Sequence, residues 1–168
     1  MEQARSGVRM GGVYKFVCRD ADGNIKWTDE THNLVTNQGL QHILDTVFSG
    51  GTAVDPWYVG LADNSPSFAA GDTLASHGGW TEFDEYTGNR QAYVETRSSQ
   101  QMSNSASTAD FPITGAGGGV GGAFLASAAT GTSGTLLCGA ALSGGNRTVA
   151  NGDTVSVTYT FSAADDGS

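Results

Sequence analysis

Charged side chains are scarce in this sequence, and basic ones are the scarcest. Lys and Arg together number 8 against 17 Asp and Glu, which gives a formal net charge of −9 at pH 7. A protein that binds nucleic acid through its phosphates needs clustered Lys and Arg. The composition therefore argues against a general nucleic-acid binder, and we expect no nucleic-acid partner.

The few basic residues are unevenly distributed along the chain. Residues 1–26 contain five basic and three acidic side chains, a local net charge of +2, whereas residues 27–168 contain three basic and 14 acidic ones, or −11. This polarity suits a protein that docks at a basic end and turns an acidic body to water. A soluble acidic domain whose basic N-terminus has no role explains the same charges.

Cysteine and long apolar runs are also nearly absent. Cys18 and Cys138 are the only cysteines, and we expect both to be free thiols packed as small apolar side chains. No stretch is apolar enough for a membrane span, and MEQARSGVRMGG, residues 1–12, lacks the apolar segment of a signal peptide. We therefore expect no membrane partner, and assembly in a cytoplasm.

Patterns that carry catalysis or bind ions are lacking too. DADGN, residues 20–24, begins like a calcium loop, but its glycine falls at the fourth place and Thr31 occupies the twelfth. The acids Glu82, Asp84 and Glu85 offer the only candidate carboxylate pair of the glycosidase kind, and adjacent acids in a polar loop usually form a solvated rim. We expect no metal, no cofactor and no enzymatic activity.

Glycine is abundant, with 25 residues, and much of the chain alternates apolar and polar side chains. Residues 154–161 show the alternation most clearly, and residues 13–29 read as a hairpin around DADGN. Further strands are expected at residues 57–63, 90–104 and 109–114. The glycine-rich stretch from residue 115 onward predicts tight strands that another backbone approaches closely.

These patterns predict an all-β fold, a single jelly-roll-like β-sandwich over residues 13–162. Residues 1–12 show no period and are expected to form a flexible N-terminal arm, and residues 163–168 a solvated tail. Residues 64–89 predict an ordered excursion with exposed aromatic side chains.

One helix interrupts the strands, in HNLVTNQGLQHILDTVFSGG, residues 32–51. Thr36 or Asn37 can cap its start, and one apolar stripe follows, made of Leu40, Ile43, Leu44, Val47 and Phe48. We expect this short helix to pack its stripe on the sandwich, closing one end or face. Leu44→Asp would then bury an unpaired charge and cost several kcal/mol.

The stretches NLVTNQGLQHILDTVFSGG, WYVGLAD and GDTVSVTYTF resemble a group of small proteins of tailed bacteriophages. The shared elements lie at residues 33–39, 58–61, 71–73 and 152–160, and the resemblance covers most of residues 12–162. These motifs are structural and not chemical. The resemblance implies a capsid cement or decoration protein, a small oligomer on the outside of the phage head without catalytic residues.

On this resemblance we expect a structural virion protein that decorates the capsid exterior and stabilises contacts between major capsid proteins. We expect a homotrimer, with a dimer at twofold positions as the alternative, and an arm that contacts the capsid through Arg5, Arg9 and Met10. The first alternative is a tail or head-fibre adsorption module that binds the host surface. A polysaccharide-degrading enzyme acting through Glu82, Asp84 or Glu85 is the second alternative.

Overall fold

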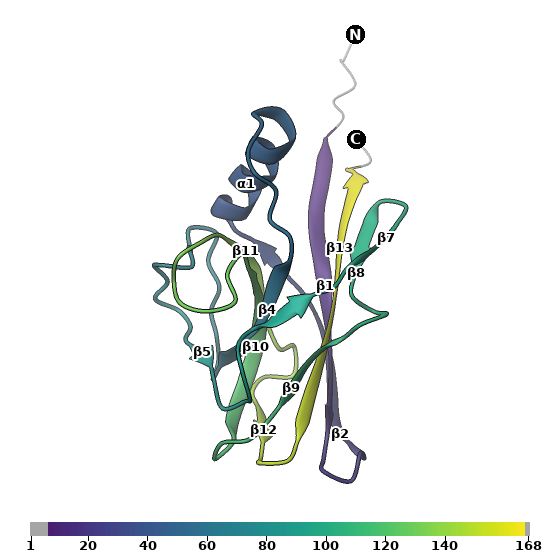
Figure 1. Cartoon of the computed structure of the whole chain (residues 1–168), viewed down its shortest axis with the longest axis vertical. Coiled ribbons are helices and arrows are strands. Elements are labelled where there is room, and N and C mark those ends of the chain that lie inside the picture. Colours follow the sequence, from purple (N-terminus) through teal and green to yellow (C-terminus); the bar gives the residue numbers. More distant parts are fainter. Residues whose placement is uncertain (1–6, 167–168) are drawn as a thin grey trace.

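The computed structural model describes residues 7–166, which form two antiparallel sheets packed face to face and one helix (Figure 1). In the first sheet the order is β2 (Ile25–His32), β1 (Val8–Arg19), β13 (Thr154–Asp165), β8 (Gln101–Ser103) and β7 (Thr96–Ser98), and β9 (Ala109–Pro112) also pairs with β13. In the second sheet the order is β3 (Leu34–Val35), β11 (Leu136–Ala141), β10 (Gly118–Ala126), β4 (Trp57–Asp63) and β5 (Glu82–Phe83). β12 (Arg147–Val149) and β6 (Gln91–Tyr93) pair with β10 and β4. The predicted β-sandwich is confirmed.

The main core lies between the two sheets and follows the alternation of the sequence. Val155, Val157 and Tyr159 of β13 are fully buried, as predicted for residues 154–161. Directly across the strand pair, Tyr14 of β1 stacks on Tyr159 with ring centroids 4.2 Å apart. The hairpin β1–β2 also forms as the sequence predicts.

Both cysteines are buried free thiols, which confirms the prediction. Burial raises the pKa of the Cys138 thiol, and burial together with the charge of Asp153 raises the pKa of Cys18 to about 11. Because thiolates are the reactive form, both thiols are protected by protonation as well as by burial.

We therefore expect neither thiol to react with a thiol-specific reagent such as DTNB at pH 8 while the protein is folded. In denaturant both thiols should react at the rate of free cysteine, since unfolding restores their ordinary pKa. Absorbance during labelling measures both rates. Rapid labelling of either thiol in the native protein would show that the core is more open at Cys18 or Cys138 than the structure indicates.

The terminal strands are longer than the sequence predicts. Val8–Gly12 of β1 pairs with Phe161–Asp165 of β13, so the predicted arm is wrong for residues 8–12, and the predicted tail is wrong for residues 163–165. Gly11 and Gly12 hide the alternation in the sequence, and Gly12 makes room for the Tyr159 ring. The pairing joins the two ends of the described chain, which no local pattern can show. Residues 1–6 lie outside the described residues.

The first part of the segment from residue 64 to 89 covers the outer face of the second sheet, whereas its later part supplies β5 to that sheet and Phe83 and Tyr86 to the main core. On the outer face, Trp80 is buried against Phe124 of β10, with ring centroids 4.8 Å apart, and its Nε1–H donates to Asp72 over 3.1 Å. Tyr86 is also buried, so the predicted exposure of these aromatic side chains is wrong. β10 is apolar on both faces and needs cover on both, and this segment supplies the second cover.

The motifs behind the resemblance hold the fold together. Asn33 donates to the Tyr159 hydroxyl over 2.9 Å and accepts from the Gly12 N–H. The two Gly-Asp-Thr motifs build the same turn twice: Asp72 and Asp153 each accept from the backbone N–H three residues earlier, and both are buried. These contacts support the prediction that the motifs are structural.

Helix α1 (Asn37–Phe48) begins where the sequence predicts, with Thr36 as its N-cap. The Thr36 hydroxyl accepts from the Gly39 N–H over 3.0 Å and donates to the Leu136 carbonyl, while Gln38 accepts from the Leu136 N–H over 2.8 Å. These bonds fasten the first turn of α1 to β11. The rest of the helix stands at one end of the sandwich, the end that also holds the start of β1 and the end of β13 (Figure 1).

The apolar stripe of α1 is mostly exposed, contrary to prediction. Leu44 is 55% exposed, Val47 65% and Phe48 79%, while Ile43 is half-buried against the core. The helix is held by its first turn and by the packing of Ile43 and His42, while its last turn projects past the strands and does not lie along a sheet.

Leu44→Asp is therefore expected to change the free energy of unfolding by less than about 1 kcal/mol, because a charge at an exposed helix position stays hydrated. Ile43→Asp, one residue earlier and half-buried, is the matched comparison and should be clearly more destabilising. Urea denaturation of both variants measures the difference. A loss of several kcal/mol in Leu44→Asp would mean that the helix lies against a sheet after all.

Candidate functional site

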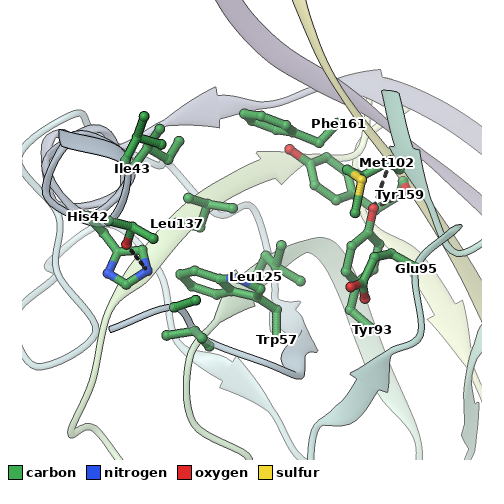
Figure 2. A pocket seen from close by; sticks show the side chains of 14 residues that line it. His42, Ile43, Trp57, Tyr93, Glu95, Met102, Leu125, Leu137, Tyr159 and Phe161 are labelled. Carbon is green, nitrogen blue, oxygen red and sulfur yellow. Dashed lines mark hydrogen bonds between the residues drawn. The ribbon is translucent and has the colours of Figure 1, made fainter. Parts of the chain in front are cut away.

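A cavity of about 290 Å³ opens at the end of the sandwich, between α1 and the last residues of both sheets (Figure 2). We call it the end cavity. It is lined by His42, Ile43, Thr46, Val47, Ala53, Val54, Trp57, Tyr93, Glu95, Met102, Leu125, Leu137, Tyr159 and Phe161. Most of these side chains are apolar, so the end cavity extends the apolar interior toward the surface.

Each wall of the end cavity comes from a different element. Its helix side is held by the edge-to-face contact of His42 with Trp57, whose ring centroids lie 5.3 Å apart at 84°. Met102 of β8 and Phe161 of β13 are direct cross-strand partners and form the wall of the first sheet. The cavity exists because α1 stands beyond the strand ends and leaves the gap between the sheets partly unfilled.

The polar groups of the end cavity are mostly engaged. The Tyr93 hydroxyl lies 2.8 Å from the Met102 carbonyl and 3.1 Å from the Tyr159 carbonyl, and it can donate to either. Burial first, and the charge of Glu95 second, raise the pKa of Tyr93, so this phenol stays neutral. The Glu95 carboxylate itself makes no hydrogen bond or ion pair with any residue of the described chain.

The later turns of α1 carry three exposed apolar side chains, one of which reaches the end cavity. Val47 lines the cavity and is exposed, whereas Leu44 and Phe48 are exposed on another face of the helix and do not line it. We call these three residues the apolar rim. Single exposed apolar residues are ordinary, and three on one short helix favour an interaction surface on α1.

The residues predicted to contact a capsid are only partly placed by the structure. Arg5 lies outside the described residues, while Arg9 is exposed on β1 and Met10 is half-buried beside it. Neither lines the end cavity. The cavity residues were missed because they come from separate segments, and the one signal in the sequence was the apolar stripe of α1.

The candidate catalytic acids are not gathered into a pair. Both oxygens of Glu82 accept from the Arg90 guanidinium, over 2.8 and 2.7 Å, and Glu85 accepts from the Ala116 N–H over 3.0 Å. In the candidate calcium loop, Asp20 instead accepts from the N–H groups of Asp22 and Asn24. Between residues 7 and 166, no three His, Cys, Asp or Glu side chains gather as metal ligands. No described helix is long and apolar enough to cross a membrane.

Comparison with known families gives the origin of the chain. Residues 35–161 match the family described as Podophage GP4 fiber I protein gp80. The chain belongs to this family. It is therefore a structural protein of a phage virion, as the sequence predicted at that level. No curated protein matches the chain.

The part shared with the gp80 family contains α1 and every residue that lines the end cavity. Arg5, Arg9 and Met10 lie before it. The match to the gp80 family therefore spans the helix and the end cavity of this chain, and it does not include the basic N-terminal segment.

Proposed function

We propose that this chain is a subunit of a phage fibre, joined to the particle by protein contacts alone. The observation that carries the proposal is the match of residues 35–161 to a family described as a fibre protein. The sandwich supports it, because α1, which carries the apolar rim, lies at one end and the turn between β1 and β2 lies at the other (Figure 1). A molecule with one apolar end suits attachment at that end, with its body turned outward.

The proposal assigns no catalysis to the chain. Glu82 is held by Arg90 and Glu85 by a backbone N–H, which leaves Asp84 without a second free carboxylate from this cluster. Glycoside hydrolysis needs two carboxyl groups that flank one bond. These contacts therefore favour a structural role over polysaccharide cleavage.

The second candidate is the capsid decoration subunit to which the motifs of the sequence point. Its supporting observation is that Arg9 is exposed on β1 at the same end as α1, where it could meet an acidic capsid surface. In that case the chain would form the predicted homotrimer on the head and contact the major capsid protein.

Copy number separates the two candidates. We expect quantitative mass spectrometry of purified particles to find far fewer copies of this chain than of the major capsid protein, because fibres occupy few positions on a particle. A copy number close to that of the major capsid protein would contradict the fibre and favour decoration. Absence from purified particles would contradict both.

A further inference from the structure

We infer that the end cavity receives an apolar side chain of another virion protein, presented next to a Lys or Arg residue. The inference rests on the proposed function, since it names the partner chemistry at the attachment end.

The volume of the end cavity suits a side chain better than a whole small molecule. At about 290 Å³ it lies at the lower limit of sites that enclose small ligands, roughly 300–1,000 Å³. Such sites also need several converging polar groups, and here the Tyr93 hydroxyl is already bonded to backbone carbonyls. An apolar hollow with little free hydrogen bonding favours an apolar occupant.

The apolar rim indicates that the occupant belongs to a protein. In protein interfaces, an anchor side chain fills a pocket while surrounding contacts exclude water. Val47, which lines the cavity and is 65% exposed, would supply part of those contacts, and a free small molecule would leave it in water. The occupant should therefore bring a surface that covers the rim.

The charge beside the end cavity is acidic. Of the described residues that line the cavity, Glu95 is the one Asp or Glu and none is Lys or Arg, and no described residue forms a hydrogen bond or ion pair with Glu95. Arg97 on β7 is the cross-strand partner of Met102, and Arg9 is exposed on β1, but neither lines the cavity. A Lys or Arg beside the anchor therefore complements the site at Glu95.

Two small probes that differ only in charge test this inference on the full chain. Phenethylamine and 3-phenylpropanoate carry the same ring on opposite charges, and NMR shifts of the Met102 methyl and the Trp57 indole report their binding. We expect phenethylamine to bind about fivefold tighter at low salt, and the preference to shrink as salt rises. Equal binding, tighter binding of phenylpropanoate, or no shift at either residue would overturn the inference.

Variants assign the binding to the end cavity. Glu95→Gln should remove the preference for the amine while leaving the ring bound, and Ala53→Trp, at an exposed lining position, should block both probes. Ile25→Ser, an exposed apolar residue at the opposite end, is the matched control and should bind like the wild type. If Glu95→Gln still prefers phenethylamine, the charge of Glu95 does not set the preference. If Ala53→Trp still binds both probes, they do not bind in the end cavity.

Incorporation of the same variants into phage particles tests whether the end cavity is used in the virion. Ala53→Trp should be lost from phage particles while Ile25→Ser is retained, provided that both melt like the wild type. Retention of Ala53→Trp would overturn the inference. Self-association that Ala53→Trp abolishes would also overturn it, by placing a second copy in the cavity. The copy number of the wild-type chain is measured independently, so the proposed function can stand when this inference fails.

Discussion

Arg90→Ala is expected to lower the free energy of unfolding by about 3–5 kcal/mol, the largest effect of any single substitution considered for this chain. Arg90 is only 6% exposed, and its guanidinium forms a two-bond contact with Glu82. It also donates to the carbonyls of Ala128 and Gly131, each over 2.8 Å, above the Phe124 ring. One side chain thus joins Glu82 of β5, the loop after β10 and the Phe124 ring of β10.

Arg90→Ala is destabilising because it leaves the partners of the guanidinium unpaired. Two carbonyls would lose their donor in a partly buried place, and Glu82 would lose its counter-charge. Arg90→Lys should recover little, because a single ammonium cannot match the flat fork that reaches Glu82 and the carbonyls together.

Glu82→Gln is the matched control for Arg90→Ala. The glutamine keeps most of the hydrogen bonding to Arg90, and the side chain at position 82 is less buried than that of Arg90. The loss in free energy of unfolding should therefore be clearly smaller. Urea denaturation followed by fluorescence, with Trp80 beside this cluster, measures all three variants. A loss below about 1 kcal/mol for Arg90→Ala would contradict the central place given to this residue.

Gly39→Ala is expected to have the second largest effect and to lower the free energy of unfolding by about 1–3 kcal/mol. Intrinsic helix propensity alone would make alanine the better residue by about 1 kcal/mol. The sign reverses because a Cβ at Gly39 would collide with the backbone of Leu137, including its carbonyl oxygen. The first turn of α1 would have to leave β11, and the bonds of Thr36 and Gln38 would weaken with it.

Gly71→Ala is the control for Gly39→Ala, because a Cβ at Gly71 meets no atom within 4 Å. It should leave stability nearly unchanged. Hydrogen exchange of the α1 amides adds a local measurement, and we expect faster exchange in Gly39→Ala. Unchanged stability and unchanged exchange would show that α1 does not depend on its contact with β11.

Features written in short stretches of sequence were predictable. The alternation of residues 154–161 fixes which side chains of β13 enter the core, and the Thr36 cap followed by an apolar period fixes where α1 starts. The motif at residues 33–39 could be recognised as structural, although its partners, Tyr159 and the residues of β11, lie more than 90 residues away.

Features that depend on distant partners were not predictable. An apolar stripe like that of α1 occurs both in helices that lie on a sheet and in helices that project beyond one. The direction of α1 depends on how it is attached to β11, and the sequence does not show that attachment. Trp80 looks exposed in a segment rich in Gly, Ser and Asp, until Asp72 and the outer face of β10 are known to surround it. The end cavity combines residues from six strands, two loops and one helix, and no spacing in the sequence brings them together.

An electron cryo-microscopy map of whole particles tests the central claim most directly, because it gives both the place and the orientation of the chain. We expect density for the sandwich within a fibre, with α1 and the apolar rim against a neighbouring protein and the β1–β2 turn pointing away. Sandwich density repeated over the head lattice, or α1 facing open solvent, would contradict the account.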